Sequence, residues 1–125
     1  MKFEKYAHIL ENFLRRHWAI AETQLTAKNY TIDHGYITGR LILLDGSYID
    51  FSEEILIVEK IASRPNYRYE YVKDKTEIFR YDNFAKHPSL RPPFHHKHIS
   101  KRRVVQLQEA PKLIDVLEEA LRYML

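Results

Sequence analysis

A cluster of titratable and cationic side chains lies between residues 80 and 103, in the stretch RYDNFAKHPSLRPPFHHKHISKRR. The stretch holds four of the seven histidines, three of the five prolines, and seven Lys or Arg residues against one acid, so its charge is +6. The whole chain is +3, and the other residues therefore sum to −3. Imidazole transfers protons near neutral pH, and imidazoles beside cations favour an anionic ligand or a metal ion. We expect the functional site in this segment.

The four consecutive residues HHKH at positions 95–98 would point alternately to two sides of an extended backbone. Side chains alternate between the two faces of a strand. His96 and His98 then project to one side, and His95 and Lys97 project to the other. One pair can face a substrate while the other pair braces the segment.

Arg80 and Asp82 are expected to share one face of a second strand, with Tyr81 on the opposite face. A carboxylate in this position can orient an imidazole by accepting its N–H. The pair Asp82-Asn83 also fits a turn or cap that closes the strand. The sequence leaves both interpretations open.

The same residue types support a metal site as an alternative. Imidazole nitrogens and a carboxylate suit zinc, manganese or nickel, and the residues that would supply them are His87, His96, His98 and Asp82. The segment lacks the i,i+4 histidine pair of H-E-x-x-H proteins, and the nearby cations oppose a divalent ion. The prediction is therefore a site without a cofactor, with the metal site as the competing hypothesis.

Length and composition place the chain among ordinary globular proteins. With 125 residues, 45% hydrophobic and 30% charged, we expect one domain over residues 1–125 that remains in the cytoplasm. No apolar run approaches the roughly 20 residues that cross a bilayer, and charges interrupt the N-terminal segment where a signal peptide has an apolar core. The absence of cysteine excludes disulfides, thiolate catalysis and zinc sites with sulfur ligands.

Hydrophobic periodicity predicts the elements that position these residues. Apolar residues at three- and four-residue spacing indicate a long helix over about residues 2–28, and the period then changes to that of strands. An antiparallel meander of about four strands is expected at 36–44, 48–61, 67–72 and 77–82. An ordered Pro/His-rich loop follows, then a short added strand near 104–107 and a C-terminal helix that begins at Pro111. The fold class is α+β, with the helices packed on one face of the sheet.

Several motifs resemble the TumE family, the toxins of prokaryotic TumE/TumA toxin–antitoxin modules. They are LDGSYIDFSE (44–53), YRYEY (67–71), FRYDN (79–83), His87-Pro88 and FHHKH (94–98). The motifs occur in family order between residues 41 and 98, and the helix-first layout agrees. The pairing of RYDN with HHKH is the specific part of the resemblance.

The resemblance implies a small toxin that pairs with an antitoxin carrying a helix-turn-helix DNA-binding domain. A helix followed by an antiparallel sheet is also the outline of small ribonuclease toxins of the RelE and barnase kind, which is an analogy of fold alone. RNA is then the expected substrate and nucleic-acid partner. No membrane partner is expected, and a homodimer is compatible with the sequence.

Cleavage of RNA without a metal needs a base for the 2′-hydroxyl, an acid for the leaving oxygen, and cations for the charge on the phosphorane. Histidine supplies either proton role, and Arg or Lys supplies the charge. We assign His96 and His98 as acid/base candidates and Arg80 and Lys97 as the cations. The full set of candidate catalytic residues is His96, His98, Arg80, Lys97, Asp82 and His87.

Other residues are candidates for contacts with nucleic acid. Tyr67, Tyr69 and Tyr71 share a strand face, where they either stack bases or form part of the core. Arg68 on the opposite face can point the same way as a catalytic residue on an adjacent strand. The set is Arg68, Lys101, Arg102, Arg103 and Tyr69. The carboxylates of Asp50 and Glu53 are either paired with arginine or available as a base.

Three hypotheses for function follow. The first is an endoribonuclease toxin with histidine-based acid/base catalysis. The second is a non-catalytic nucleic-acid-binding or regulatory partner in the same module, whose binding would be sensitive to salt. The third is a metal-dependent nuclease or phosphotransfer enzyme. The first is the one that the clustered histidines favour.

Overall fold

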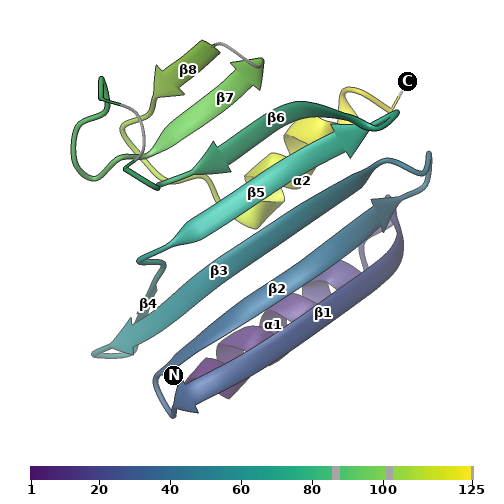
Figure 1. The fold of residues 1–125 in the computed structure, drawn as a ribbon. Coiled ribbons are helices and arrows are strands. Elements are labelled where there is room, and N and C mark those ends of the chain that lie inside the picture. Colours follow the sequence, from purple (N-terminus) through teal and green to yellow (C-terminus); the bar gives the residue numbers. More distant parts are fainter. Residues whose placement is uncertain (86–87, 101–102, 125) are drawn as a thin grey trace.

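The structure of the chain is a computed structural model that describes residues 1–85, 88–100 and 103–124 (Figure 1). Within these ranges it contains two helices and eight strands. In chain order they are α1 (Phe3–Arg15), β1 (Ile20–Thr31), β2 (His34–Leu43), β3 (Tyr48–Val58), β4 (Ile61–Ser63), β5 (Tyr67–Lys73), β6 (Thr76–Asp82), β7 (His96–Ser100), β8 (Arg103–Gln106) and α2 (Leu113–Leu121). The fold is therefore α+β, as predicted.

All strand pairings among these elements are antiparallel, and they form one sheet in the order β1-β2-β3-β5-β6-β7-β8, with β4 paired to β3. Both helices lie on the same face of the sheet, α1 behind β1 and β2 and α2 behind β5 and β6 (Figure 1). The hydrophobic core lies between the helices and this face. Among the described residues, no helix lies on the other face of the sheet, from which polar strand residues such as Arg40 and Asp50 project.

The predicted N-terminal helix is too long. Helix α1 ends at Arg15, and residues from Ile20 onward form β1. The apolar spacing of residues 18–25 fits a helix, but pairing with β2 decides the conformation. Gly39 shows the fit, because a Cβ at this position would lie 2.6 Å from Leu25 Cδ2 of β1. Local periodicity carries no information about a pairing partner that lies later in the sequence.

The predicted count of about four strands is also wrong. Strands β2, β3, β5 and β6 correspond to the predicted meander, and the turn over Asp45-Gly46-Ser47 is present, with Gly46 at φ +86°. The sheet is extended by β1 at one edge and by β7 and β8 at the other, and the short strand near 104–107 is found as β8. Residues 96–98, expected to be extended but not counted among the strands, belong to β7, because this segment completes its backbone hydrogen bonds along β6.

The hairpin between β5 and β6 sets the register on which the site depends. Asp74 and Lys75 have φ of +51° and +63°, which is the geometry of a two-residue turn whose twist matches that of the strands. A register shift follows at Tyr71, and the strands then run in step until Arg68 lies opposite Asp82. The turn therefore fixes which residue of β5 lies beside the acidic residue of β6.

Candidate functional site

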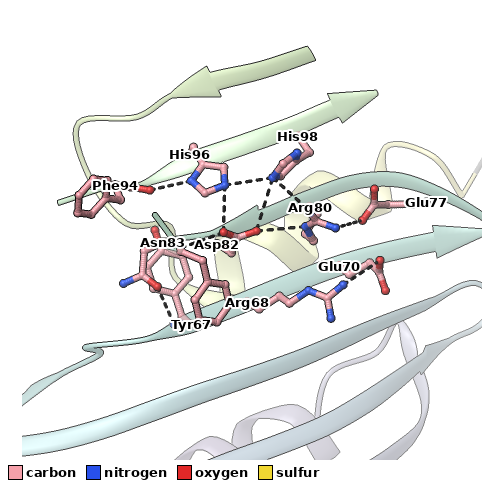
Figure 2. A network of polar contacts seen from close by, with 11 residues as sticks. Tyr67, Arg68, Glu70, Glu77, Arg80, Asp82, Asn83, Phe94, His96 and His98 are labelled. Atoms are coloured by element: carbon pink, nitrogen blue, oxygen red, sulfur yellow. Dashed lines mark hydrogen bonds and ion pairs between the residues drawn. The ribbon is translucent and has the colours of Figure 1, made fainter. Parts of the chain in front are cut away.

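Two neighbouring strands supply the central side chains of the candidate site (Figure 2). Arg80 and Asp82 come from β6, and His96 and His98 come from β7. The register pairs Arg80 with His98 and Asp82 with His96. All four side chains project from the face of the sheet that carries no helix. The structure therefore brings together four of the residues that the sequence singled out.

Asp82 is the centre of the hydrogen-bond network. Its Oδ1 lies 3.0 Å from His96 Nε2, and its Oδ2 accepts a hydrogen bond of 3.1 Å from Arg80 Nε. His98 Nε2 lies 3.6 Å from Oδ2, and the backbone N–H of Phe84 donates to Oδ1 at 3.0 Å. Asp82 and His96 are 4% and 3% exposed, so the carboxylate meets its partners in a site that excludes most of the solvent.

The hydrogen-bond partners of three ring nitrogens indicate which of these nitrogens carry a proton. His96 Nδ1 lies 2.7 Å from the carbonyl oxygen of Phe94, so this nitrogen donates. His96 Nε2 faces Asp82 Oδ1, a second acceptor. His98 Nε2 lies 3.0 Å from Arg80 Nη2, which can only donate, so His98 accepts there. The two Nε2 atoms lie 3.0 Å apart, so the single Nε2–H of His96 is shared between Asp82 Oδ1 and His98 Nε2.

The electrostatic surroundings of His98 agree with this assignment. Burial lowers the pKa of the His98 imidazole below its ordinary value of 6.5, and the Arg80 guanidinium lowers it further. Asp82 acts in the opposite direction but does not cancel these effects. His98 is therefore neutral at pH 7 and accepts protons, whereas His96 has acceptors at both nitrogens. An imidazole that accepts a proton, beside one whose nitrogens face acceptors, can take up one proton and pass on another.

The same three side chains could hold a metal ion. The ligand atoms of Asp82, His96 and His98 lie within 4.8 Å of one another. The carbonyl of Phe94 holds His96 Nδ1 in the way that such partners orient a histidine ligand. Arg80 opposes this use, because its Nη2 occupies the lone pair of His98 that would bind the ion. The donor set fits a divalent ion once Arg80 moves away from His98.

A sequence model of the family described as Toxin TumE matches residues 7–125. The chain belongs to this family. The match includes every residue of the Asp82–His96–His98 cluster and confirms the resemblance that the motifs indicated. No curated protein and no solved structure matches the chain.

Family membership makes the chain the toxin component of a toxin–antitoxin module, and the family implies an antitoxin as its partner. Neither helix in the described ranges is long and apolar enough to cross a bilayer. The family match by itself carries no reaction mechanism, so the chemistry has to be argued from the site.

Two further charged residues adjoin the cluster on the same face of the sheet. Arg68 lies opposite Asp82 in the register and contacts Glu70 at 3.4 Å. Glu77 lies 3.3 Å from Arg80 Nη1 and balances part of its charge. The prediction that Arg68 points the same way as a catalytic residue on the next strand agrees with this register. Its role toward nucleic acid stays a prediction.

Lys97 lies on the opposite face of β7 and is not part of the cluster. Its Nζ pairs with Glu119 of α2 and lies 5.1 and 5.2 Å from the ring centroids of Phe79 and Tyr81. The structure therefore corrects the expectation that Lys97 is a cation at the reacting phosphate, because its side chain lies on the helix side of the sheet. A residue between two site histidines on a strand must face the other side of the sheet.

Of four other predicted residues, the structure describes only Arg103. His87, Lys101 and Arg102 lie outside the described residues, so their predicted roles stay predictions. Arg103 begins β8 and is exposed. The strands therefore place one cation of the predicted basic tail at the edge of the sheet that adjoins β7.

Tyr67, Tyr69 and Tyr71 are core residues, each no more than 1% exposed. The proposed stacking of Tyr69 on a base is therefore wrong for this structure, because the ring has no accessible face. Tyr67 has a second contact, a hydrogen bond of 2.7 Å between its hydroxyl and Nδ1 of His95. Burial lowers the pKa of His95, and the Arg64 guanidinium lowers it further. His95 thus braces β7 on the helix side, as the alternation of the HHKH run predicted.

The carboxylates of Asp50 and Glu53, considered as possible bases from the sequence, have different surroundings. Asp50 forms a bidentate pair with Arg40, with distances of 2.7 and 2.9 Å, on the exposed face of the sheet. Glu53 is buried on the helix side and accepts hydrogen bonds from the hydroxyls of Tyr6 and Tyr69. Burial raises its pKa, although both hydroxyls and the Arg64 guanidinium act against that rise. Glu53 thus lies on the opposite face from the histidines.

Several contributors to these sites carried no signal in the sequence. The carbonyl of Phe94 fixes His96, but a backbone group has no motif. Glu119 and Arg64 lie at positions where charge is common, and only the packing of α2 brings Glu119 to Lys97. The alternation of strand faces was the one signal that could have excluded Lys97 from the site.

Proposed function

We propose that this toxin is an endoribonuclease that cleaves RNA by acid/base catalysis at the His96–His98 pair. The observation that carries the proposal is the hydrogen bond of 3.0 Å between the two Nε2 atoms, in which one imidazole donates and the other accepts. The lowered pKa of His98 keeps it a base at neutral pH. Arg80, within 3.0 Å of His98, is a cation at the position where the phosphorane would carry its charge.

The proposed reaction uses only groups of the chain and of the RNA. His98 takes the proton of the 2′-hydroxyl as the 2′-oxygen attacks phosphorus. Arg80 turns from His98 to the phosphate and stabilises the phosphorane. The His96–His98 pair returns one proton to the leaving 5′-oxygen as the P–O bond breaks. The products are a 2′,3′-cyclic phosphate and a 5′-hydroxyl, and the proton count of the pair is unchanged.

Asp82 and Arg68 have supporting roles in this proposal. Asp82 orients His96 through the contact of 3.0 Å at Nε2 and holds Arg80 at its other oxygen. Arg68, opposite Asp82 in the register, extends the cationic surface that would bind the RNA backbone. Arg103 at the start of β8 shares its face with Val105, the register partner of Lys97, so it does not extend this surface. The partly exposed Arg68 would make binding sensitive to salt.

A second candidate is a metal-dependent nuclease, favoured by the convergence of three ligand atoms within 4.8 Å. In that case Asp82, His96 and His98 would hold a divalent ion, which supplies a Lewis acid and a metal-bound water as nucleophile. The two candidates differ in one requirement. The acid/base reaction is independent of chelator, and the metal reaction is abolished by it.

The test is cleavage of end-labelled cellular RNA by the purified toxin, with and without excess chelator, beside the His96→Ala/His98→Ala double variant. Cleavage that resists chelator, yields 2′,3′-cyclic phosphate ends and is lost in the variant supports the first candidate. Cleavage that chelator removes and added Mn²⁺ or Zn²⁺ restores supports the second. Toxicity in cells that persists in the double variant would reject both, and would leave the non-catalytic hypothesis.

The finer description of the module is also part of the proposal. We infer that the toxin acts on RNA in the cytoplasm and that its antitoxin carries a helix-turn-helix domain, as the motifs of the TumE family imply. The reading frame beside the toxin gene tests the second point directly, because it should encode such a domain.

A further inference from the structure

A groove lies on the helix face of the sheet, between α1 and the start of α2. It has a volume of about 560 Å³ and is open to solvent at one side. Its walls are mostly apolar, from Ile9, Leu10 and Phe13 of α1 and from Leu113 and Ile114 of α2. Pockets of this size and lining are typical binding sites.

The apolar surface extends beyond the groove along α1. A second hollow of about 580 Å³ shares Ile9 and Phe13 with the first and reaches Trp18. Ile9, Phe13 and Trp18 are 51%, 43% and 70% exposed. A contiguous apolar surface on a monomer, rimmed by polar residues, indicates an interaction site.

The charged residues of these two hollows are mainly cationic. Arg16, Arg64 and Lys112 line them, together with the carboxylate of Glu53. Glu53 is buried, and two tyrosine hydroxyls occupy its oxygens. The net charge of the lining is therefore positive, with the cations nearer the solvent than the acid.

Arg64 is a cationic group in the lining of the groove. Its Nη1 donates to the hydroxyl of Tyr69 at 2.6 Å and to the carbonyl of Pro111. A guanidinium has five N–H donors, so these two acceptors leave donors for a ligand carboxylate. An apolar wall around a partly used guanidinium fits an acidic side chain flanked by apolar ones.

We propose that this groove binds a segment of the cognate antitoxin that presents apolar side chains and at least one carboxylate. The family supplies the partner, because a TumE toxin belongs to a module with an antitoxin. The cationic lining defines the chemistry of the segment, and an amphipathic helix laid into a groove is a recurrent mode of such binding. The groove and His98 lie on opposite faces of the sheet, so the groove is an anchor that leaves the histidines uncovered.

The proposal rests on family membership and not on the ribonuclease reaction, so the two fail separately. The experiment measures binding of the toxin to the purified antitoxin encoded beside it, by calorimetry, for the wild type and for Phe13→Glu, Ile9→Glu and Lys112→Glu. The matched control is Val58→Glu, which puts the same charge at an apolar residue that is 58% exposed and outside the groove. All four changes are at exposed positions, and circular dichroism and melting temperature verify the folding of each variant.

We expect Phe13→Glu and Ile9→Glu each to weaken binding at least about 30-fold, the effect of a central interface residue. Lys112→Glu should weaken it less and reduce its dependence on salt, and Val58→Glu should bind like the wild type. Folded variants at Phe13 and Ile9 that bind as tightly as the wild type would overturn the proposal. RNA cleavage by the free variants is measured in parallel, and it should be unchanged.

Discussion

His96 and His98 form a hydrogen-bonded pair in which only one member is accessible to solvent. Their Nε2 atoms are 3.0 Å apart, but the side chain of His96 is 4% exposed and that of His98 is 22% exposed. A substrate can therefore reach His98 directly, while His96 lies behind it between Asp82 and the carbonyl of Phe94. This order assigns distinct roles to two histidines that look equivalent in the sequence.

Replacement of His98 should abolish most of the cleavage activity. We expect His98→Asn to reduce the rate of RNA cleavage by about 10²–10⁴-fold, the usual contribution of a positioned acid or base. The measurement is single-turnover cleavage of end-labelled RNA. His95→Asn is the matched control, because His95 is also on this segment but contacts Tyr67 on the helix side. Equal losses in both variants would show that His98 has no special role.

The pH dependence of cleavage should reveal the effect of Arg80 on the pKa of His98. Burial and the Arg80 guanidinium lower the pKa of His98, so the acid limb of kcat/KM should have its midpoint below pH 6.5. Removal of a neighbouring cation stabilises the imidazolium and raises the pKa. Arg80→Met should therefore move the acid limb to higher pH, besides lowering the rate.

The control for this shift is Arg40→Met, which removes the same charge from the exposed Arg40–Asp50 pair, away from the histidines. Its acid limb should coincide with that of the wild type. A midpoint that stays constant in Arg80→Met would show that another group than His98 is the base.

Much of the fold could be predicted from the sequence, and the errors have one physical cause. Strands β2, β3, β5 and β6 have extended patterns in the sequence, and Asp45-Gly46-Ser47 is a local turn signal, so both were predictable, whereas the short β4 was not distinguished from β3. Strand β1 was assigned to a helix, because its apolar spacing is ambiguous and its conformation depends on pairing with β2. Residues 95–98 were treated as extended but not counted as a strand, because the pairing of β7 with β6 and β8 is not visible in the local sequence.

The site was predictable where strand alternation decides it. The shared face of His96 and His98, and that of Arg80 and Asp82, follow from a period of two, and the structure brings both pairs together. Alternation also excludes Lys97, which charge alone had favoured. Contacts that depend on the packing of a distant element, such as that of Glu119 with Lys97, need the tertiary structure.

The Asp82 carboxylate should contribute strongly to stability. Because Asp82 is buried against Arg80 and His96, Asp82→Ala leaves their N–H donors without their carboxylate acceptor, and we expect a loss of about 3–5 kcal/mol in the free energy of unfolding. Asp50→Ala removes an exposed pair of good geometry and should cost less than about 1 kcal/mol. Urea denaturation of both variants measures the difference. Similar losses would mean that burial does not distinguish the two carboxylates.

Lys97 should be a structural residue and not a catalytic one. Its ammonium joins β7 to α2 through Glu119, and both side chains are mostly buried. Lys97→Met keeps the apolar stem and removes the charge, so we expect a loss of about 1–3 kcal/mol in stability, as for a hydrogen bond to a charged group. Cleavage per folded molecule should stay at the wild-type rate. A double-mutant cycle with Glu119→Gln measures the coupling by urea denaturation. If Lys97→Met keeps its stability but loses cleavage, Lys97 acts in the reaction as a cation at the phosphate.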